Sequence, residues 1–323
     1  MGNDQSTAVS RREAMAASLL AAGGVLLGGS SLAQAQQQKA KPIRIAHLTD
    51  MHVQPERRAG EGYAAALQSL VKLDPPPDFL VTGGDHVMDV MKQPLDRAIV
   101  QWDLYQRVLA ENTKIPVRPV IGNHDIWGWG RPEDVSVDAP GYGRAMALDR
   151  LGIAKPYYAF DAGPAWRAIV LDSMTQRGKG YYGDLGPEQT EWLKGELQSI
   201  GTTRPIVIFS HIPILSACVF FDGKDRLGPE AWNVPDAWMH RDVRELLDVF
   251  QPCNVKLLVS GHIHLVDRVE YRGMTFVCNG AVCGNWWKGP LQQFPEGYGV
   301  INLHADGRFD HRFVTYGWKA IEE

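Results

Sequence analysis

The sequence predicts an α/β fold with a mostly parallel sheet, and three observations support this. From Pro42 onward, short apolar runs alternate with segments of helical spacing. The 323 residues, 45% of them hydrophobic, suffice for one large domain or two small ones with a sizeable core. The last part of the chain then alternates as strands around turns at Arg272-Gly273 and Asp306-Gly307.

The beginning of the chain has the features of an export signal. The paired residues Arg11 and Arg12 precede an apolar run over 14–32, and small residues follow at Ala33 and Ala35. This order resembles a twin-arginine signal, which implies delivery by the twin-arginine (Tat) export machinery to the periplasm or the medium. An ordinary secretory signal and an uncleaved anchor stay open as alternatives. The apolar run is short and glycine-rich for a stable membrane helix. We therefore expect no stable membrane insertion after cleavage.

This interpretation divides the chain into a signal peptide over 1–35, a polar leader over 36–41 and a folded domain over 42–323. Within the domain, strands are expected at 43–48, 79–82, 117–121, 157–160, 166–171, 206–209 and 255–259, and helices at 62–73, 94–112, 187–200 and 242–250. Segments 127–150 and 215–239 have no clean period. We interpret both as long irregular segments, and such segments usually serve function or move.

Side chains that can bind a metal follow five of the predicted strands. The strand at 117–121 leads into Gly122-Asn123-His124-Asp125. The other four strands lead into Asp50 with His52, Asp85, His211, and His262 with His264. In open α/β sheets this edge is where ligands bind, and imidazole and amide groups suit divalent metals. Each cluster alone is ordinary turn chemistry, but five in one chain indicate a metal site. The remaining histidines are interpreted as structural: His47, His86, His240, His304 and His311.

The ordered set resembles the signature of the calcineurin-like metallophosphoesterase superfamily: D-x-H, G-D, G-N-H-D/E, H and G-H-x-H. Here it reads Asp50-x-His52, Gly84-Asp85, Gly122-Asn123-His124-Asp125, His211 and Gly261-His262-x-His264. The resemblance covers about residues 43–315. It implies a four-layer α/β/β/α sandwich and a metal-dependent hydrolase of phosphoric esters.

The resemblance also implies residue roles. One transition metal ion (Mn, Fe or Zn) would be held by Asp50, His52, Asp85 and His264. A second would be held by Asp85, Asn123, His211 and His262. Asp85 would bridge the two ions, and a hydroxide shared between them would attack phosphorus in line. His124 would contact the phosphoryl group or protonate the leaving oxygen. Asp125 would either orient His124 or only cap the turn.

Departures from related branches narrow the expected activity. Met88 stands where purple acid phosphatases have a tyrosine ligand, and Asp125 stands where protein phosphatases have glutamate. The pattern resembles the single-domain phosphodiesterase branch, so a phosphodiesterase acting on a small-molecule phosphoester is predicted. A phosphomonoesterase of the same fold is the alternative within this class. A catalytically silent metal-binding scaffold is the alternative outside it.

Charge, aromatic residues and cysteines leave the substrate open. The net charge of −4 gives no electrostatic footprint for a nucleic acid polymer. Cys278 and Cys283 could pair in an oxidising compartment, but a sequence does not fix connectivity. Six aromatic residues in irregular segments either border the site or pack loops onto the sheet: Trp127, Trp129, Phe220, Phe221, Trp286 and Trp287. The oligomeric state and the identity of the metals also stay open.

Overall fold

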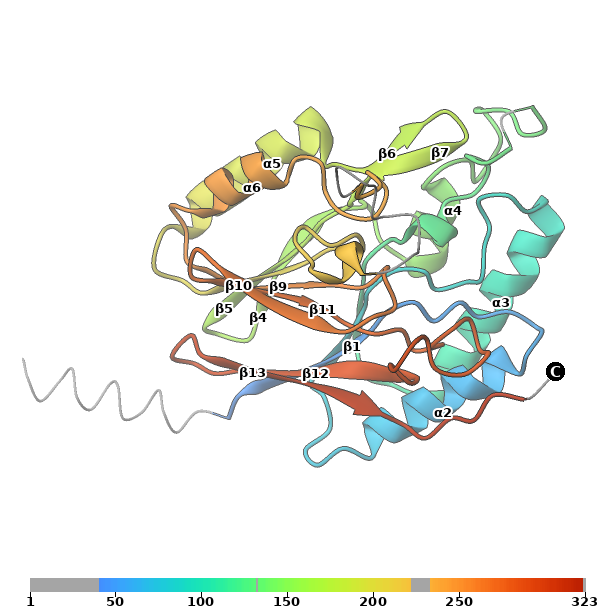
Figure 1. Cartoon of the computed structure of the whole chain (residues 1–323), viewed down its shortest axis with the longest axis horizontal. Coiled ribbons are helices and arrows are strands. Elements are labelled where there is room, and N and C mark those ends of the chain that lie inside the picture. Colours follow the sequence, from blue (N-terminus) through green and yellow to red (C-terminus); the bar gives the residue numbers. More distant parts are fainter. Residues whose placement is uncertain (1–40, 132, 222–232, 322–323) are drawn as a thin grey trace, which may run out of the picture.

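The structure is a computed structural model that describes residues 41–131, 133–221 and 233–321. In these residues two β-sheets pack face to face, and helices cover the outer face of each sheet (Figure 1). This arrangement confirms the predicted four-layer α/β/β/α sandwich. The predicted signal peptide over 1–35 and most of the leader over 36–41 lie outside the described residues, as does part of the irregular segment, 222–232.

The first sheet has five strands and lies next to two helices. In spatial order its strands are β13 (Phe309–Thr315), β12 (Gly297–Leu303), β1 (Ile43–Leu48), β2 (Phe79–Thr82) and β3 (Val117–Pro119). The helices are α2 (Ala59–Val71) and α3 (Leu95–Asn112). β1, β2 and β3 are parallel, whereas β12 runs antiparallel to β1 and β13 antiparallel to β12.

The second sheet has six strands, and the remaining long helices lie on its outer face (Figure 1). In spatial order its strands are β10 (Asp267–Tyr271), β11 (Met274–Cys278), β9 (Val255–Ser260), β8 (Ile206–Phe209), β5 (Trp166–Val170) and β4 (Tyr158–Ala162). The helices are α5 (Gly186–Ile200) and α6 (Val243–Phe250). β5, β8, β9 and β11 are parallel, and the edge strands β4 and β10 are antiparallel. The parallel arrangement predicted for the βαβαβ run is confirmed for β1, β2 and β3. The strands of the sandwich form two sheets rather than one, and each sheet is mixed because antiparallel strands flank its parallel part.

Three apolar layers hold the sandwich together, and β8 shows how one strand serves two of them. Val207 and Phe209 point into the core between the sheets, while Ile206 and Ile208 pack with the side chains of α5 and α6. Side chains alternate across a strand, so a continuous apolar run buries both faces. A third layer joins α2 and α3 to the first sheet.

Two segments differ from the prediction. A helix, α4 (Ala145–Leu151), ends the region predicted as one long loop, because Met146 and Ala147 are buried and Gly152 supplies a left-handed C-cap at φ 66°. A hairpin of β6 (Met174–Arg177) and β7 (Gly180–Gly183) was not predicted, since its polar sequence carries no strand-like apolar run. Among the described residues, no helix is both long and apolar enough to cross a membrane.

Candidate metal centre

The five clusters predicted at strand ends lie together at one edge of the sandwich. β1, β2 and β3 of the first sheet and β8 and β9 of the second each end just before one cluster. Parallel strands point the same way, so their carboxyl ends bring the clusters to one edge. Seven side chains of metal-binding type meet there: Asp50, His52, Asp85, Asn123, His211, His262 and His264.

Backbone strain is concentrated at these residues. Residues other than glycine rarely adopt the left-handed backbone region at positive φ, because it costs about 1–3 kcal/mol per residue. Where they do, the positions cluster at functional sites. Five of the seven are found there: Asp50 (φ 55°), His52 (φ 43°), Asp85 (φ 53°), His262 (φ 72°) and His264 (φ 62°). These strained backbone conformations direct the polar side chains toward one common point.

The first group consists of Asp50, His52 and His264. Asp50 Oδ2 accepts hydrogen bonds from the Thr49 hydroxyl at 2.7 Å and from the His262 backbone amide at 2.9 Å. The other oxygen, Oδ1, is buried and has no hydrogen-bond partner among the described residues. It lies 3.3 Å from His264 Nε2 and 4.0 Å from His52 Nε2. A buried carboxylate oxygen without a hydrogen-bond partner, close to two imidazoles, is well placed to bind a metal ion together with them.

The second group consists of Asn123, His211 and His262. His211 Nε2 lies 3.1 Å from Asn123 Oδ1 and 3.2 Å from His262 Nδ1. Asp85 lies between the two groups, because its Oδ2 is 3.5 Å from His52 Nε2 and 3.2 Å from His211 Nε2. One carboxylate oxygen therefore faces both groups.

Backbone carbonyls fix the tautomers of all four histidines. His52 Nδ1, His211 Nδ1, His262 Nε2 and His264 Nδ1 donate to the carbonyls of Met88 (3.2 Å), Gly83 (2.8 Å), Ala237 (2.8 Å) and Gly284 (2.8 Å). The second ring nitrogen of each imidazole then points toward the centre, where a neutral ring offers a lone pair. Two such nitrogens lie 3.2 Å apart in each group, a spacing that a metal ion or a proton on one ring can stabilise.

The pKa shifts agree with this need. Burial lowers the pKa of His52 and of His262 to about 3, which keeps both imidazoles neutral and able to bind a metal. Burial also acts to lower the pKa of His211, but the Asp85 carboxylate outweighs it and raises this pKa to about 9. The pKa of His264 is likewise raised, because burial, which acts to lower it, is outweighed by the Asp50 carboxylate. In the metal-free protein a proton on one ring of each group, His211 and His264, supplies positive charge that a bound metal would supply. The residues present therefore fit two metal positions.

Glycines make the close approach of these residues possible. A β-carbon at Gly122 would collide with Asp85 Oδ1, and one at Gly261 would collide with the Thr49 hydroxyl. In both motifs the glycine is therefore a steric requirement of the site.

His124 lies at the rim of the centre rather than inside it. Its backbone amide donates to Asp85 Oδ1 at 2.8 Å, and its ring meets the His52 ring edge-on with centroids 4.8 Å apart. The side chain is 30% exposed, and its Nδ1 lies 3.7 Å from Asp89 Oδ1. Burial acts to lower the pKa of His124, whereas the charge of Asp85 and the nearby Asp89 raise it, and the net direction is upward. The imidazole is placed to meet a ligand of the centre and to carry a proton.

Asp125 holds the turn that carries Asn123 and His124. It accepts hydrogen bonds from the backbone amides of Asp85 (3.0 Å), His86 (2.8 Å) and Gly122 (2.8 Å) and from His86 Nδ1 (2.8 Å). Among the described residues, none of its hydrogen bonds reaches His124. These contacts favour the second interpretation made from sequence, a cap for the turn, and Asp89 is the carboxylate beside His124.

Removing the Asp125 carboxylate should therefore cost stability. The Asp125→Ala variant leaves three buried backbone amides and one imidazole without their acceptor, and each unsatisfied group costs about 1–3 kcal/mol before relaxation. We expect the free energy of unfolding to fall by about 3 kcal/mol or more, measured by denaturant titration. A variant of unchanged stability with strongly reduced activity would instead assign Asp125 a direct part in the chemistry.

The aromatic residues divide between the site and the core. The Trp286 ring lies 4.5 Å from the His264 ring centroid and 5.9 Å from that of His52, so it borders the centre. Trp127, Trp129 and Trp287 are buried in the core around α2 and α3, as the packing interpretation predicted. Tyr181 on β7 also borders the centre, since its ring centroid lies 6.3 Å from that of His262 in an edge-on arrangement. The sequence did not point to this residue, because no apolar run marks the β6–β7 hairpin.

The chain matches the family model described as calcineurin-like phosphoesterase over residues 43–266. This span is more than half of the chain and includes all seven residues of the centre. The chain belongs to the calcineurin-like phosphoesterase family. The resemblance noted from the ordered motifs is confirmed at this level, and members of this family depend on metals.

Curated relatives of this phosphoesterase carry two kinds of name. It is 29% identical to the serine/threonine-protein phosphatase CPPED1 of Bos taurus over 221 residues, which are 67% of this chain and 63% of that protein. The chain thus spans less than two thirds of this relative. It is 24% identical to the 3',5'-cyclic adenosine monophosphate phosphodiesterase CpdA of Haemophilus influenzae over 286 residues, which are 84% of this chain and 89% of that protein.

Solved structures share the fold. A dimetal phosphatase from Danio rerio has a TM-score of 0.60 at 15% identity, with 85% of this chain and 96% of that chain covered. GAP50 of Plasmodium, described as the anchor in the inner membrane complex, has a TM-score of 0.53 at 16% identity, with 86% of each chain covered. At these identities the likeness shows the fold alone.

Proposed function

We propose that this chain is a dinuclear metal-dependent phosphoester hydrolase, and more narrowly a phosphodiesterase acting on a small-molecule phosphoester. The observation that carries the proposal is Asp85 Oδ2, which faces both the first and the second group of imidazoles. The diesterase assignment is supported by the relative named a cyclic adenosine monophosphate phosphodiesterase, which this chain matches over most of both lengths. A phosphomonoesterase is the second candidate, because other relatives are named phosphatases.

The residues of the centre would hold one metal ion in each group. Asp50, His52 and His264 with Asp85 would hold one ion, and Asp85 with Asn123, His211 and His262 would hold the other. When bound, such a pair supplies a nucleophilic water near neutral pH and offsets negative charge on the phosphoryl oxygens. The identity of the metals does not follow from these nitrogen and oxygen ligands, and Mn, Fe and Zn all suit them.

His124 would then meet the substrate. Its ring stands beside His52 at the rim, and Asp89 near its Nδ1 favours the protonated form. A protonated imidazole can donate a hydrogen bond to a phosphoryl oxygen or a proton to the leaving oxygen. Trp286 would border the same space and contact the organic part of the substrate.

Two nitrophenyl esters test the proposal and separate its two forms. The metal-loaded protein is assayed on bis-p-nitrophenyl phosphate, a diester, and on p-nitrophenyl phosphate, a monoester. A higher kcat/KM on the diester is expected. A higher value on the monoester would replace the diesterase by the phosphomonoesterase. Failure on both esters, with metals bound, would favour the catalytically silent scaffold.

The scaffold alternative is the weaker one. GAP50, which shares the fold, is described as an anchor, but that likeness concerns the fold alone. Loss of metal-binding side chains would be the expected mark of a silent member. In this chain all seven residues are present and converge, and His124 stands beside them.

We also propose that the protein is exported through the twin-arginine route to the periplasm or the medium. The support is the sequence order of Arg11 and Arg12, an apolar run, and small residues at Ala33 and Ala35. Because this route carries folded proteins, the metal centre would be loaded before export.

A reporter fused behind residues 1–40 tests the route. We expect it to reach the periplasm and to stay in the cytoplasm when Arg11 and Arg12 are both replaced by lysine, because the receptor reads the arginine pair. Reporter activity in separated cell fractions is the measurement. If the Lys–Lys form is exported as well as the original, the twin-arginine assignment is wrong and a general secretory signal takes its place.

A further inference from the structure

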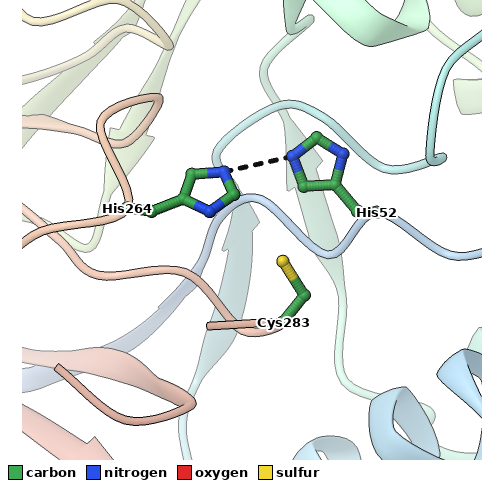
Figure 2. A group of neighbouring side chains, drawn as sticks. All are labelled: His52, His264 and Cys283. Carbon is green, nitrogen blue, oxygen red and sulfur yellow. Dashed lines mark hydrogen bonds between the residues drawn. The ribbon is translucent and has the colours of Figure 1, made fainter. Parts of the chain in front are cut away.

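A cysteine thiol lies beside the first group of the metal centre. Figure 2 shows the sulfur of Cys283 pointing toward the space between the rings of His52 and His264. The Cys283 Sγ and one ring nitrogen of each histidine all lie within 4.8 Å of one another, and all three residues are buried. The sequence suggested only a disulfide with Cys278 for this residue, whereas both cysteines have free thiols in the structure.

The position of the thiol is fixed by the backbone around it. The Cys283 amide donates to the Asp50 carbonyl at 3.3 Å, and the preceding amide of Val282 donates to the Thr49 carbonyl at 2.9 Å. The following carbonyl, that of Gly284, accepts from His264 Nδ1 at 2.8 Å. The segment with Cys283 is thus tied both to the segment that carries Asp50 and to the His264 ring. Such ties hold a side chain in a defined place beside the centre.

The thiol already interacts with a side chain of the first group. Its contact to the Gly284 carbonyl is long, at 3.6 Å for a weak S–H donor, and it also hydrogen-bonds with the His264 side chain. The side chain is fully buried, which excludes water as a general partner. The sulfur faces a ring nitrogen of His52 and a ring nitrogen of His264, two of the groups that would surround a metal ion.

We propose that Cys283 is a further ligand of the metal held by Asp50, His52 and His264. On binding, the thiol would release its proton to solvent, and the thiolate sulfur would donate an electron pair to the metal. The inference rests on the proposed dinuclear centre and adds to it. A thiolate favours softer, borderline ions such as Zn²⁺ over Mn²⁺, whereas the second group offers only nitrogen and oxygen donors. The two positions would therefore differ in metal preference.

Cobalt(II) reports sulfur ligation directly. The metal-free protein is loaded with Co²⁺, bound cobalt is quantified, and the near-ultraviolet absorption is recorded under reducing conditions. Thiolate bound to cobalt gives an intense charge-transfer band that nitrogen and oxygen ligands do not give. We expect the band in the original protein, and its loss in Cys283→Ser and Cys283→Ala.

Cys278→Ser is the matched control. Cys278 is equally buried, but its Sγ contacts the Gly261 carbonyl at 3.2 Å and it belongs to none of the potential metal-binding groups among the described residues. This variant should keep the band. Cobalt bound without a band in the original protein, or a band that survives Cys283→Ser, would overturn the ligation by Cys283 and leave the dinuclear centre standing. A protein that binds no cobalt would overturn the centre and this inference with it. If the Cys283 variants do not fold, the spectrum of the original protein still shows whether a thiolate binds the cobalt.

Discussion

Asp85→Asn is expected to weaken both metal positions at once and to abolish most of the activity. Asp85 Oδ2 lies near an imidazole of each group, 3.5 Å from His52 Nε2 and 3.2 Å from His211 Nε2. An amide keeps the shape of the side chain but removes the negative charge that would screen the repulsion between two cations. Loss of several kcal/mol of transition-state stabilisation, at about 1.4 kcal/mol per factor of ten, lowers kcat/KM by roughly 10³-fold.

Metal content per chain and kcat/KM on the diester are the two measurements for this variant. Asp172→Asn is the control, because Asp172 is also buried and follows β5 at the same sheet edge, but pairs with Arg144 and has no place in either group. The control should keep both metals. An Asp85→Asn protein that loses only one metal would restrict Asp85 to a single position, and one that keeps both metals and its activity would remove it from the centre.

His124→Ala is expected to keep both metals and to lose activity in a way that depends on the leaving group. His124 shares a turn with Asn123, but its side chain stands at the rim, with Nδ1 3.7 Å from Asp89 Oδ1. An alkoxide leaves poorly without a proton, so an alkyl phosphodiester should lose about 10²–10⁴ in rate, the usual effect of general acid catalysis. A nitrophenolate leaves readily without a proton, so the nitrophenyl ester should lose much less.

The ratio of the two losses is the measurement, and the nitrophenyl ester serves as the internal control for folding and metal loading. Equal losses on both esters would assign His124 to stabilising the phosphoryl oxygens rather than to proton donation. His52, His124 and Asp85 also form a close group that could hold an ion. Loss of a metal from His124→Ala would therefore make His124 a ligand and require the two groups to be redrawn.

The sequence carried most of the information about the site, because each cluster directly follows an apolar strand. β1, β2 and β8 have the predicted bounds, and residues just after such strands must lie at the carboxyl edge of a sheet. The pairing of strands was less predictable. β12 joins the first sheet beside β1, where Gly299 pairs with His47, 252 positions earlier in the chain. Alternation in the tail does not reveal such a long-range partner.

Other features depend on contacts that no local pattern contains. The carbonyls that orient the four histidines come from distant turns, such as Gly284 for His264 and Gly83 for His211. Asp125 could be read from sequence as a partner of His124 or as a cap, and only the packed structure shows its bonds to Asp85 and His86. The position of Cys283 beside the first group likewise follows from tertiary packing.

The metal dependence of the activity is the sharpest test of the dinuclear centre. Purified mature protein is analysed for its elements, stripped with a chelator and titrated with a single transition metal while diester hydrolysis is followed. Activity should disappear with the metal and return to a plateau as two ions bind per chain. Active protein that contains no Mn, Fe, Zn or Co, or that keeps its activity after both ions are removed, would contradict a dinuclear metal-dependent hydrolase.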